Sequence, residues 1–297
     1  MQTIEFTKKQ FEHLSPLELP NDIIHTECKL FLFPIKTRWH SHVDVLKSFY
    51  IQDTKVFGNK LYIINTLIDE KERLNVPELV TPDRLVIVNH NVVGYSMPYI
   101  ANTNLIHALN SFNVPTAKKI EYLRSVGQIL NKMKAIRDNG VEDTFYLGDI
   151  HENQFLVDSE TDSIKVVDLD SCLIGTAQPS PSKYLASNSN LTQLRKKYPT
   201  NGTIHIPNEN SDLLCYNLMV LNFIANINTS LLPTSEYYNY LSYLNTMKMD
   251  IKLLNCFEKL YTHSNNSNPE PYLDTLLDKT PESSYQVYQY KKSKKRI

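Results

Sequence analysis

The sequence predicts an α+β protein in which a strand-rich first third precedes a mostly helical remainder. Up to Pro98, short apolar runs rich in β-branched and aromatic residues alternate with turn signals, a pattern typical of strands. After Pro98, longer segments repeat apolar residues every three or four positions, as amphipathic helices do. The chain has 297 residues, 41% hydrophobic and 21% charged, which suits one large or two small globular domains.

The first third is expected to hold two paired strands, one helix and a hairpin. Residues 29–35 (KLFLFPI) and 43–50 (VDVLKSFY) are apolar or alternating runs that we expect to pair as strands. Residues 55–67 (KVFGNKLYIINTL) place their apolar side chains along one helical stripe. Residues 84–88 (RLVIV) and 92–97 (VVGYSM) flank a short polar turn, so they predict a hairpin.

The remainder is expected to be mostly helical, with one small hairpin near its start. Residues 116–137 show the apolar spacing of a long amphipathic helix. A loop at 146–151 (YLGDIH) leads into residues 155–168, where two apolar runs surround a polar turn and predict a second hairpin. Residues 172–210 are polar and irregular, and from Asp212 onwards the apolar spacing is again helical.

Composition and charge disfavour several classes of protein. No run of about 18 apolar residues occurs, and the first residues lack the apolar block of a signal peptide, so we expect a cytoplasmic protein without a membrane span. The four cysteines are far apart, which disfavours a disulfide framework and a structural zinc site and predicts buried thiols. The balance of 31 Lys+Arg against 32 Asp+Glu disfavours nucleic acid as a partner.

The basic run at residues 291–297 (KKSKKRI) is the exception to this balanced charge. Such a run could touch phosphate groups or anionic lipid. A short terminal charge run is nevertheless more typical of a solvated, disordered end, which is what we expect here.

Two carboxylates stand out because of their settings. Asp149 follows Gly148 in the loop before the second predicted hairpin, and Asp168 ends that hairpin. Closure of the hairpin would return Asp168 towards Asp149, with the amide oxygens of Asn153 and Gln154 between them. Such oxygen ligands suit a hard divalent cation, and an aspartate can accept the proton of a reacting hydroxyl, the combination that phosphoryl transfer needs. Taken singly, either aspartate is better explained as a turn or strand-end residue.

Residues 148–157 (GDIHENQFLV) and 164–171 (IKVVDLDS) resemble the catalytic loop and the metal-binding motif of the protein-kinase-like superfamily. That superfamily includes bacterial Ser/Thr kinases and the aminoglycoside and choline phosphotransferases. The resemblance is coarse over residues 22–225 and specific only around 146–171. It implies an ATP- and Mg²⁺-dependent enzyme that transfers the γ-phosphate of ATP to a hydroxyl group.

The resemblance also implies a two-lobed protein-kinase-like fold. A small β-rich N-lobe would comprise residues 1–98 and cover the nucleotide. A larger helical C-lobe would comprise residues 99–290 and carry the catalytic loop. Residues 291–297 would form a basic C-terminal tail.

Each candidate at the phosphate end receives a role from the resemblance. Asp149 stands where the catalytic-loop aspartate orients the acceptor hydroxyl, and Asp168 where the DFG aspartate chelates Mg²⁺. Lys47 stands on the strand whose lysine contacts the α- and β-phosphates. The metal-binding asparagine is expected five residues after the catalytic aspartate, where Gln154 stands, with Asn153 one position earlier.

Further candidates follow at the hinge and around the loop. Met97, Tyr99 and Ile100 resemble the hinge between the lobes, whose backbone groups would be available to adenine. His151 matches the GDxH context of the small-molecule phosphotransferases, where its imidazole would contact the γ-phosphate or orient the loop; alternatively it packs beneath the loop. Asp212 resembles the later aspartate that ties down the catalytic loop, a role compatible with a helix cap.

The chain departs from the family pattern at three places. No glycine precedes Gly58, so the turn expected to cover the phosphates, near residues 25–29, has none. The helix glutamate that pairs with the family lysine is replaced by Lys60 in the alignment of residues 59–67. DLD replaces DFG, so Asp170 adds a carboxylate that either supports the metal site or is merely solvated.

We expect a Ser/Thr protein kinase, because the irregular segment 173–210 is long enough for an activation segment and contains several serines. The GDIH context with His151 favours a small-molecule kinase as the alternative. The missing glycine-rich loop and the displaced glutamate favour a third hypothesis, that the protein is a pseudokinase that acts as a binding module. ATP is the expected partner in all three, and a structural protein with a chance motif is the remaining possibility.

Overall fold

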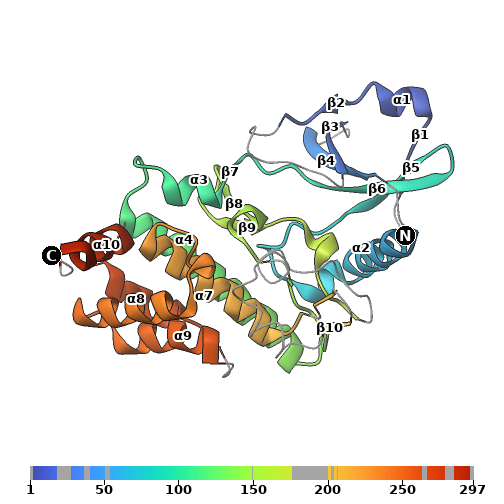
Figure 1. Ribbon diagram of the computed structural model, residues 1–297. Helices are drawn as coiled ribbons and strands as arrows, with labels where there is room; N and C mark the ends of the chain where they lie inside the picture. Colours follow the sequence, from blue (N-terminus) through green and yellow to red (C-terminus); the bar gives the residue numbers. More distant parts are fainter. Residues whose placement is uncertain are drawn as a thin grey trace.

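The computed structural model describes ten segments of the chain: residues 3–18, 28–36, 41–50, 54–148, 150–175, 200–201, 204–205, 207–262, 266–277 and 284–294. They form an α+β protein, as the sequence predicts, and its larger sheet is mixed and six-stranded. Figure 1 shows this sheet and helix α2 at one end of the molecule and helices α7 to α10 at the other.

The described strands are β1 Thr3–Phe6, β2 Ser15–Pro16, β3 Cys28–Lys36, β4 Ser41–Phe49, β5 Arg84–Val88, β6 Asn91–Pro98, β7 Asn102–Asn104, β8 Phe155–Asp158, β9 Ile164–Val166, β10 Thr200–Asn201 and β11 Ile204–His205. The described α-helices are α1 Lys8–Glu12, α2 Thr54–Leu74, α3 Leu105–Asn110, α4 Thr116–Asp138, α7 Glu209–Ala225, α8 Thr234–Thr246, α9 Ile251–Thr262 and α10 Ser284–Lys294. Short 3₁₀ helices are η1 Glu152–Gln154, η2 Leu169–Ser171, η4 Thr229–Leu231 and η5 Glu270–Leu276.

The six-stranded sheet has the order β1-β5-β6-β4-β3-β2. Its β3–β4 pair and β5–β6 hairpin confirm the strands predicted in the first third of the chain, and α2 confirms the predicted helix. The sequence pattern did not predict β1, which pairs in parallel with β5 and gives the sheet its mixed character. The phosphate-covering turn is expected near residues 25–29. Residues 25–27 lie outside the described residues, and residues 28 and 29 belong to β3.

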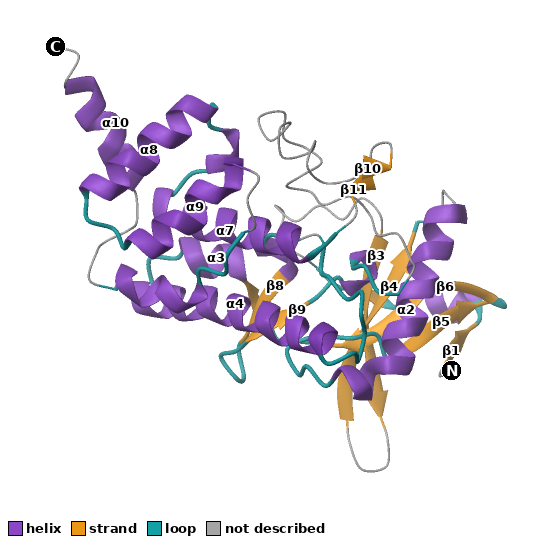
Figure 2. Ribbon diagram, turned by 90° about the horizontal axis from the view of Figure 1, so that it is seen from below, coloured by secondary structure: helices purple, strands orange, loops and turns teal. Residues whose placement is uncertain are grey.

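A second, three-stranded sheet lies between the large sheet and the helices (Figure 2). Its β8–β9 hairpin confirms the prediction for residues 155–168, and β7 adds to it in an antiparallel register. Val166 of β9 also donates its N–H to the carbonyl of Glu78, and Val80 donates to the carbonyl of Val166. These bonds tie the small sheet to the chain that leads from α2 into β5.

Helix α7 lies at the centre of the helical part. Its residues from Leu214 to Ala225 are nearly all buried, because the helix is apolar on every side. Helix α4 packs against it through a buried stripe that includes Leu123, Val126 and Leu130. This apolar body supports the loop that joins α4 to β8.

Two other sequence predictions concern the cysteines and the basic C-terminal residues. All four cysteines are buried free thiols, as predicted. The prediction of a disordered basic end is wrong for residues 291–294, because they form the last turn of α10, where Lys292 Nζ lies 2.5 Å from a carboxylate oxygen of Glu236. Residues 295–297 and most of the irregular segment 172–210 lie outside the described residues. None of the helices in the described ranges is both long and apolar enough to cross a membrane.

Candidate functional site

A cavity of about 430 Å³ lies where the large sheet meets the small one. Apolar side chains from β3, β4 and β8 form part of its wall, and the chain that follows β6 forms another part. The predicted site residues that line it are Lys47, Met97, Tyr99, Ile100, Asn153 and Asp168. The structure therefore brings together candidates that are up to 121 positions apart in the chain.

Lys47 is the buried cation of this site. It lies on β4 between Leu30 of β3 and Tyr95 of β6, and only 6% of its surface is exposed. Its ammonium group pairs with the carboxylates of Asp168 and Asp170, at 2.5 Å in the second case. Burial alone would lower the pKa of Lys47, but these two carboxylates raise it well above its ordinary value, so the side chain is charged.

Asp168 presents its carboxylate to the cavity from a turn. The residue follows β9 and has a left-handed backbone, with φ of 66°, which is uncommon outside glycine. Its side chain remains 43% exposed while it pairs with Lys47. A carboxylate that is both anchored and accessible is suited to binding a cation from the cavity.

Asp170 has the opposite environment, since it is 1% exposed. Its Oδ1 accepts hydrogen bonds from Lys47 Nζ and from the hydroxyl of Tyr95 at 2.9 Å, and its Oδ2 accepts from Lys60 Nζ at 2.6 Å. Although burial alone would raise the pKa of Asp170, the two ammonium groups hold it below its ordinary value. The alternative of a merely solvated Asp170 is therefore wrong.

Asn153 and Gln154 lie on η1, and Asn153 lines the cavity whereas Gln154 is not among the lining residues. Gln154 is 2% exposed, and neither polar atom of its side-chain amide has a hydrogen-bond partner among the described residues. The same holds for Oδ1 of Asn153, which lines the cavity with Asp168. Of these two amides only that of Asn153 lines the cavity, so its Oδ1 is the one that a ligand there could satisfy.

The donor set suits Mg²⁺. Carboxylate and amide oxygens, supplemented by water and phosphate oxygens, are the ligands that this ion takes in nucleotide sites. No group of three or more His, Cys, Asp or Glu side chains suited to a metal occurs in the described ranges. Asp168 with Asn153 or Gln154 would need the nucleotide to complete the coordination.

His151 has a local structural role. Its Nδ1 accepts a hydrogen bond from the N–H of Asn153 at 3.2 Å, which caps η1. This bond agrees with a histidine that orients the loop, and His151 is not among the residues that line the cavity. Asp149, the predicted catalytic aspartate, lies outside the described residues.

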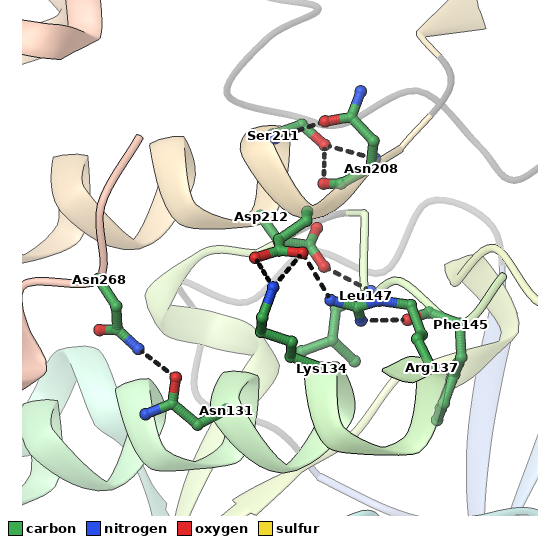
Figure 3. Close-up of polar contacts among 10 residues, drawn as sticks. Asn131, Lys134, Arg137, Phe145, Leu147, Asn208, Ser211, Asp212 and Asn268 are labelled. Atoms are coloured by element: carbon green, nitrogen blue, oxygen red, sulfur yellow. Dashed lines mark hydrogen bonds and ion pairs between the residues drawn. The ribbon is translucent and has the colours of Figure 1, made fainter. Parts of the chain in front are cut away.

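The loop before Asp149 is held by α7 (Figure 3). Asp212 accepts hydrogen bonds from the backbone N–H groups of Leu147 and Gly148, both at 2.9 Å, in agreement with the predicted loop anchor. Arg137 of α4 holds the same loop by donating to the carbonyl of Phe145 at 2.8 Å. Burial raises the pKa of Asp212 to about 6, and the two backbone bonds oppose this only in part.

The predicted hinge is partly engaged within the protein. The N–H of Tyr99 donates to the carbonyl of Val43 at 3.1 Å, and the carbonyl of Ile100 accepts from Asn102 Nδ2 at 2.5 Å. The N–H of Tyr99 is therefore not available to adenine, whereas the carbonyl of Ile100 keeps a second lone pair. An adenine ring at Met97 to Ile100 would have to use the remaining backbone groups or the apolar walls.

Sequence reasoning missed one member of the site. It gave no role to Tyr95, which donates to Asp170 and lies opposite Lys47 in the β4–β6 register. The signal was present, because both strands were predicted and Tyr95 lies on the inner strand of the hairpin. It also noted Lys60 as a departure without assigning it a contact, whereas the structure joins it to Asp170.

Comparison with known proteins finds no family model and no curated protein that matches this chain. Assignment of a function therefore depends on the residues themselves. The site geometry provides a cavity, a buried lysine, an accessible carboxylate and the unpartnered amide oxygen of Asn153 at one place.

Proposed function

We propose that the protein is an ATP- and Mg²⁺-dependent phosphotransferase of the protein-kinase-like superfamily, with lobes at residues 1–98 and 99–290. The preferred acceptor is a Ser or Thr hydroxyl of a protein. The observation that carries the proposal is the cavity in which Lys47 pairs with Asp168 beside the unpartnered amide of Asn153. A buried cation, an accessible carboxylate and amide oxygens are the groups that a metal-bound polyphosphate requires.

Adenine would occupy the apolar part of the cavity. Leu30 and Val45 of the large sheet face this space from one side, and Leu156 of β8 lines it as well. A cavity of about 430 Å³ lies in the size range of small-molecule sites. The backbone after Met97 would contact the edge of the ring through the groups that Val43 and Asn102 leave unused.

The polyphosphate would lie at the polar end of the cavity. Asp168, with Asn153 or Gln154, would hold Mg²⁺, which when bound neutralises phosphate charge. The ammonium group of Lys47 would then exchange the Asp168 carboxylate for phosphate oxygens. Asp170 would keep Lys47 in place during that exchange, because it binds the same ammonium group from the buried side.

Transfer of the γ-phosphate requires an oriented acceptor hydroxyl. Asp149 would accept the proton of that hydroxyl. The oxygen of the acceptor hydroxyl would form a bond to the γ-phosphorus while the bond between the γ-phosphorus and the bridging oxygen breaks, which releases ADP. Asp212 supports this role by fixing the two backbone amides that precede Asp149. His151 supports it by capping η1 on the other side of the loop.

The test is transfer of labelled γ-phosphate from ATP by the full chain in the presence of Mg²⁺. We expect the wild-type protein to transfer label and the Asp149→Ala and Asp168→Asn variants to lose about 100-fold or more in rate. Asp69→Asn is the matched control, because Asp69 is an exposed carboxylate on α2. Equal rates in all four proteins would contradict the mechanism.

The destination of the label separates the alternatives. Label on the chain itself or on a generic protein supports the protein kinase. Label only on a small hydroxyl compound supports the small-molecule kinase that the His151 context favours. ATP binding that raises the unfolding temperature without any turnover supports the pseudokinase.

A further inference from the structure

The buried charges around Lys47 form a cluster of four residues: Lys47, Lys60, Tyr95 and Asp170. None of them is more than 7% exposed. Both ammonium groups also lie within 6 Å of the ring centre of Phe49, at 5.6 Å for Lys47 and 5.3 Å for Lys60. One buried carboxylate therefore serves two buried lysines that come from different elements, β4 and α2.

The two oxygens of Asp170 have separate partners. Oδ1 accepts from Lys47 Nζ and Tyr95, whereas Oδ2 accepts from Lys60 Nζ. Because Lys60 uses the other oxygen, it does not compete with Lys47. Lys60 instead fixes the orientation of the Asp170 carboxylate, and this orientation sets the direction of the hydrogen bond between Oδ1 and Lys47 Nζ.

The charge balance of the cluster also depends on Lys60. Lys47 and Lys60 carry two positive charges, and Asp170 supplies one negative charge from inside the protein. Asp168 supplies a second negative charge, but its side chain is 43% exposed and faces the cavity. When Asp168 is engaged elsewhere, the buried part keeps a net positive charge, which favours an anion at Lys47.

We propose that Lys60 and Asp170 are positioning residues that together hold Lys47 for the phosphate groups of the nucleotide. The resemblance to the protein-kinase-like superfamily implies a glutamate on the helix as the partner of Lys47. Asp170 supplies a carboxylate in place of that glutamate, and Lys60 anchors it to α2. This inference rests on the proposed phosphotransferase function and adds how the phosphate-binding Lys47 is held in position. It also couples Lys47 to the placement of α2, since Lys60 reaches Asp170 from that helix.

The first experiment compares Lys60→Met with Lys71→Met in the full chain. Lys71 is the matched control, because it is a lysine of the same helix whose ammonium group pairs with Asp83 instead of Asp170. We expect Lys60→Met to lower kcat for ATP turnover at least 10-fold with a smaller change in KM, and Lys71→Met to leave both unchanged. Lys60→Arg should recover most of kcat, because a guanidinium group can still bind Oδ2.

A loss of thermal stability without a change in kcat would show that Lys60 is only structural, and it would overturn the inference. Unfolding temperatures of all variants are therefore measured in the same buffer. Equal kcat values for Lys60→Met and Lys71→Met would overturn it as well.

The second experiment moves the carboxylate to the helix, which tests the inference even where Lys60→Met fails to fold. Lys60→Glu places an added carboxylate near Lys47, and Asp170→Asn removes the native one. We expect each single variant to lose at least 10-fold in kcat and the double variant to be more active than either. A double variant whose loss equals the product of the two single losses would overturn the inference.

The wild-type measurements separate the two proposals. If the wild-type protein turns over Mg-ATP and Lys60→Met changes kcat no more than Lys71→Met does, only the positioning role is overturned. A wild-type protein that neither binds nor turns over Mg-ATP overturns the proposed function and this inference with it.

Discussion

Asp168 and Asp170 leave the same short turn but reach different surroundings. Asp168 adopts a left-handed backbone and keeps its carboxylate partly exposed at the cavity. Asp170, two residues later on η2, directs its carboxylate into the protein towards Lys60 and Tyr95. The turn at Asp168 therefore lets one segment supply both an accessible and a buried partner for Lys47.

Gly94 allows the close approach of β6 to β4 at Lys47. A Cβ atom at this position would lie 1.8 Å from the carbonyl oxygen of Lys47, so a side chain requires the backbone to move. We expect Gly94→Ala to lower the free energy of unfolding by about 2 kcal/mol, as measured by urea denaturation.

The matched control for this prediction is Gly58→Ala on α2. Nothing lies within 4 Å of a Cβ at Gly58, and alanine has the higher helix propensity. This variant should raise the free energy of unfolding by about 0.5 to 1 kcal/mol. Similar effects at both glycines would contradict the close approach.

At the scale of elements, α7 connects the apolar core to the loop before Asp149. The helix begins with a capping box, in which Asn208 and Ser211 each bond the backbone of the other (Figure 3). The next residue, Asp212, accepts the two loop amides. The buried carboxylate of Asp212 at the start of α7 thus holds the loop. Its burial makes the charged form of the carboxylate costly.

This anchor predicts a pH dependence. The pKa of Asp212 is raised by burial from an ordinary value of 3.8 to about 6. Between these pH values the unfolded chain is deprotonated at this position while the folded chain retains the proton. The stability contributed by Asp212 is therefore present at low pH and is lost as the pH rises through about 6.

We expect the wild-type protein to lose stability relative to Asp212→Asn as the pH rises from 4 to 7, because the amide does not titrate. Urea denaturation of both proteins at several pH values measures this difference. The variant is expected to be the less stable protein at low pH, because its amide cannot accept both N–H bonds. A difference that is independent of pH would contradict the raised pKa.

For the whole molecule, the cavity lies between elements from both halves of the chain. A ligand there would contact β4 of the large sheet and η1 before the small one. A ligand that binds only the folded protein raises the free energy of unfolding by RT ln(1 + [L]/Kd), about 2.7 kcal/mol at a hundredfold excess over Kd.

We therefore expect Mg-ATP to raise the unfolding temperature of the wild-type protein more than ATP with a chelator does. Asp168→Asn should lose the Mg²⁺-dependent part of the shift, whereas Asp69→Asn, an exposed change on α2, should retain it. Thermal denaturation with each ligand measures the shifts. Identical shifts with and without Mg²⁺ in the wild-type protein would contradict the metal site.

Local patterns predicted most elements near the site. The strands that carry Lys47 and Met97 and the hairpin that precedes Asp168 follow from period-two apolar runs and turn residues, as observed. The parallel pairing of β1 with β5 could not be predicted in this way, because it joins segments about 80 residues apart that share no turn.

By itself, the sequence determined most of the strands and helices near the site, because periodicity is a local property of the chain, and the family resemblance of its motifs grouped Lys47, Asp168 and Asn153. Only the tertiary structure decided the fate of Asp170 and Lys60. Whether a charge is solvated or buried depends on which remote elements pack over it, and here β4, β6 and α2 all converge on one carboxylate.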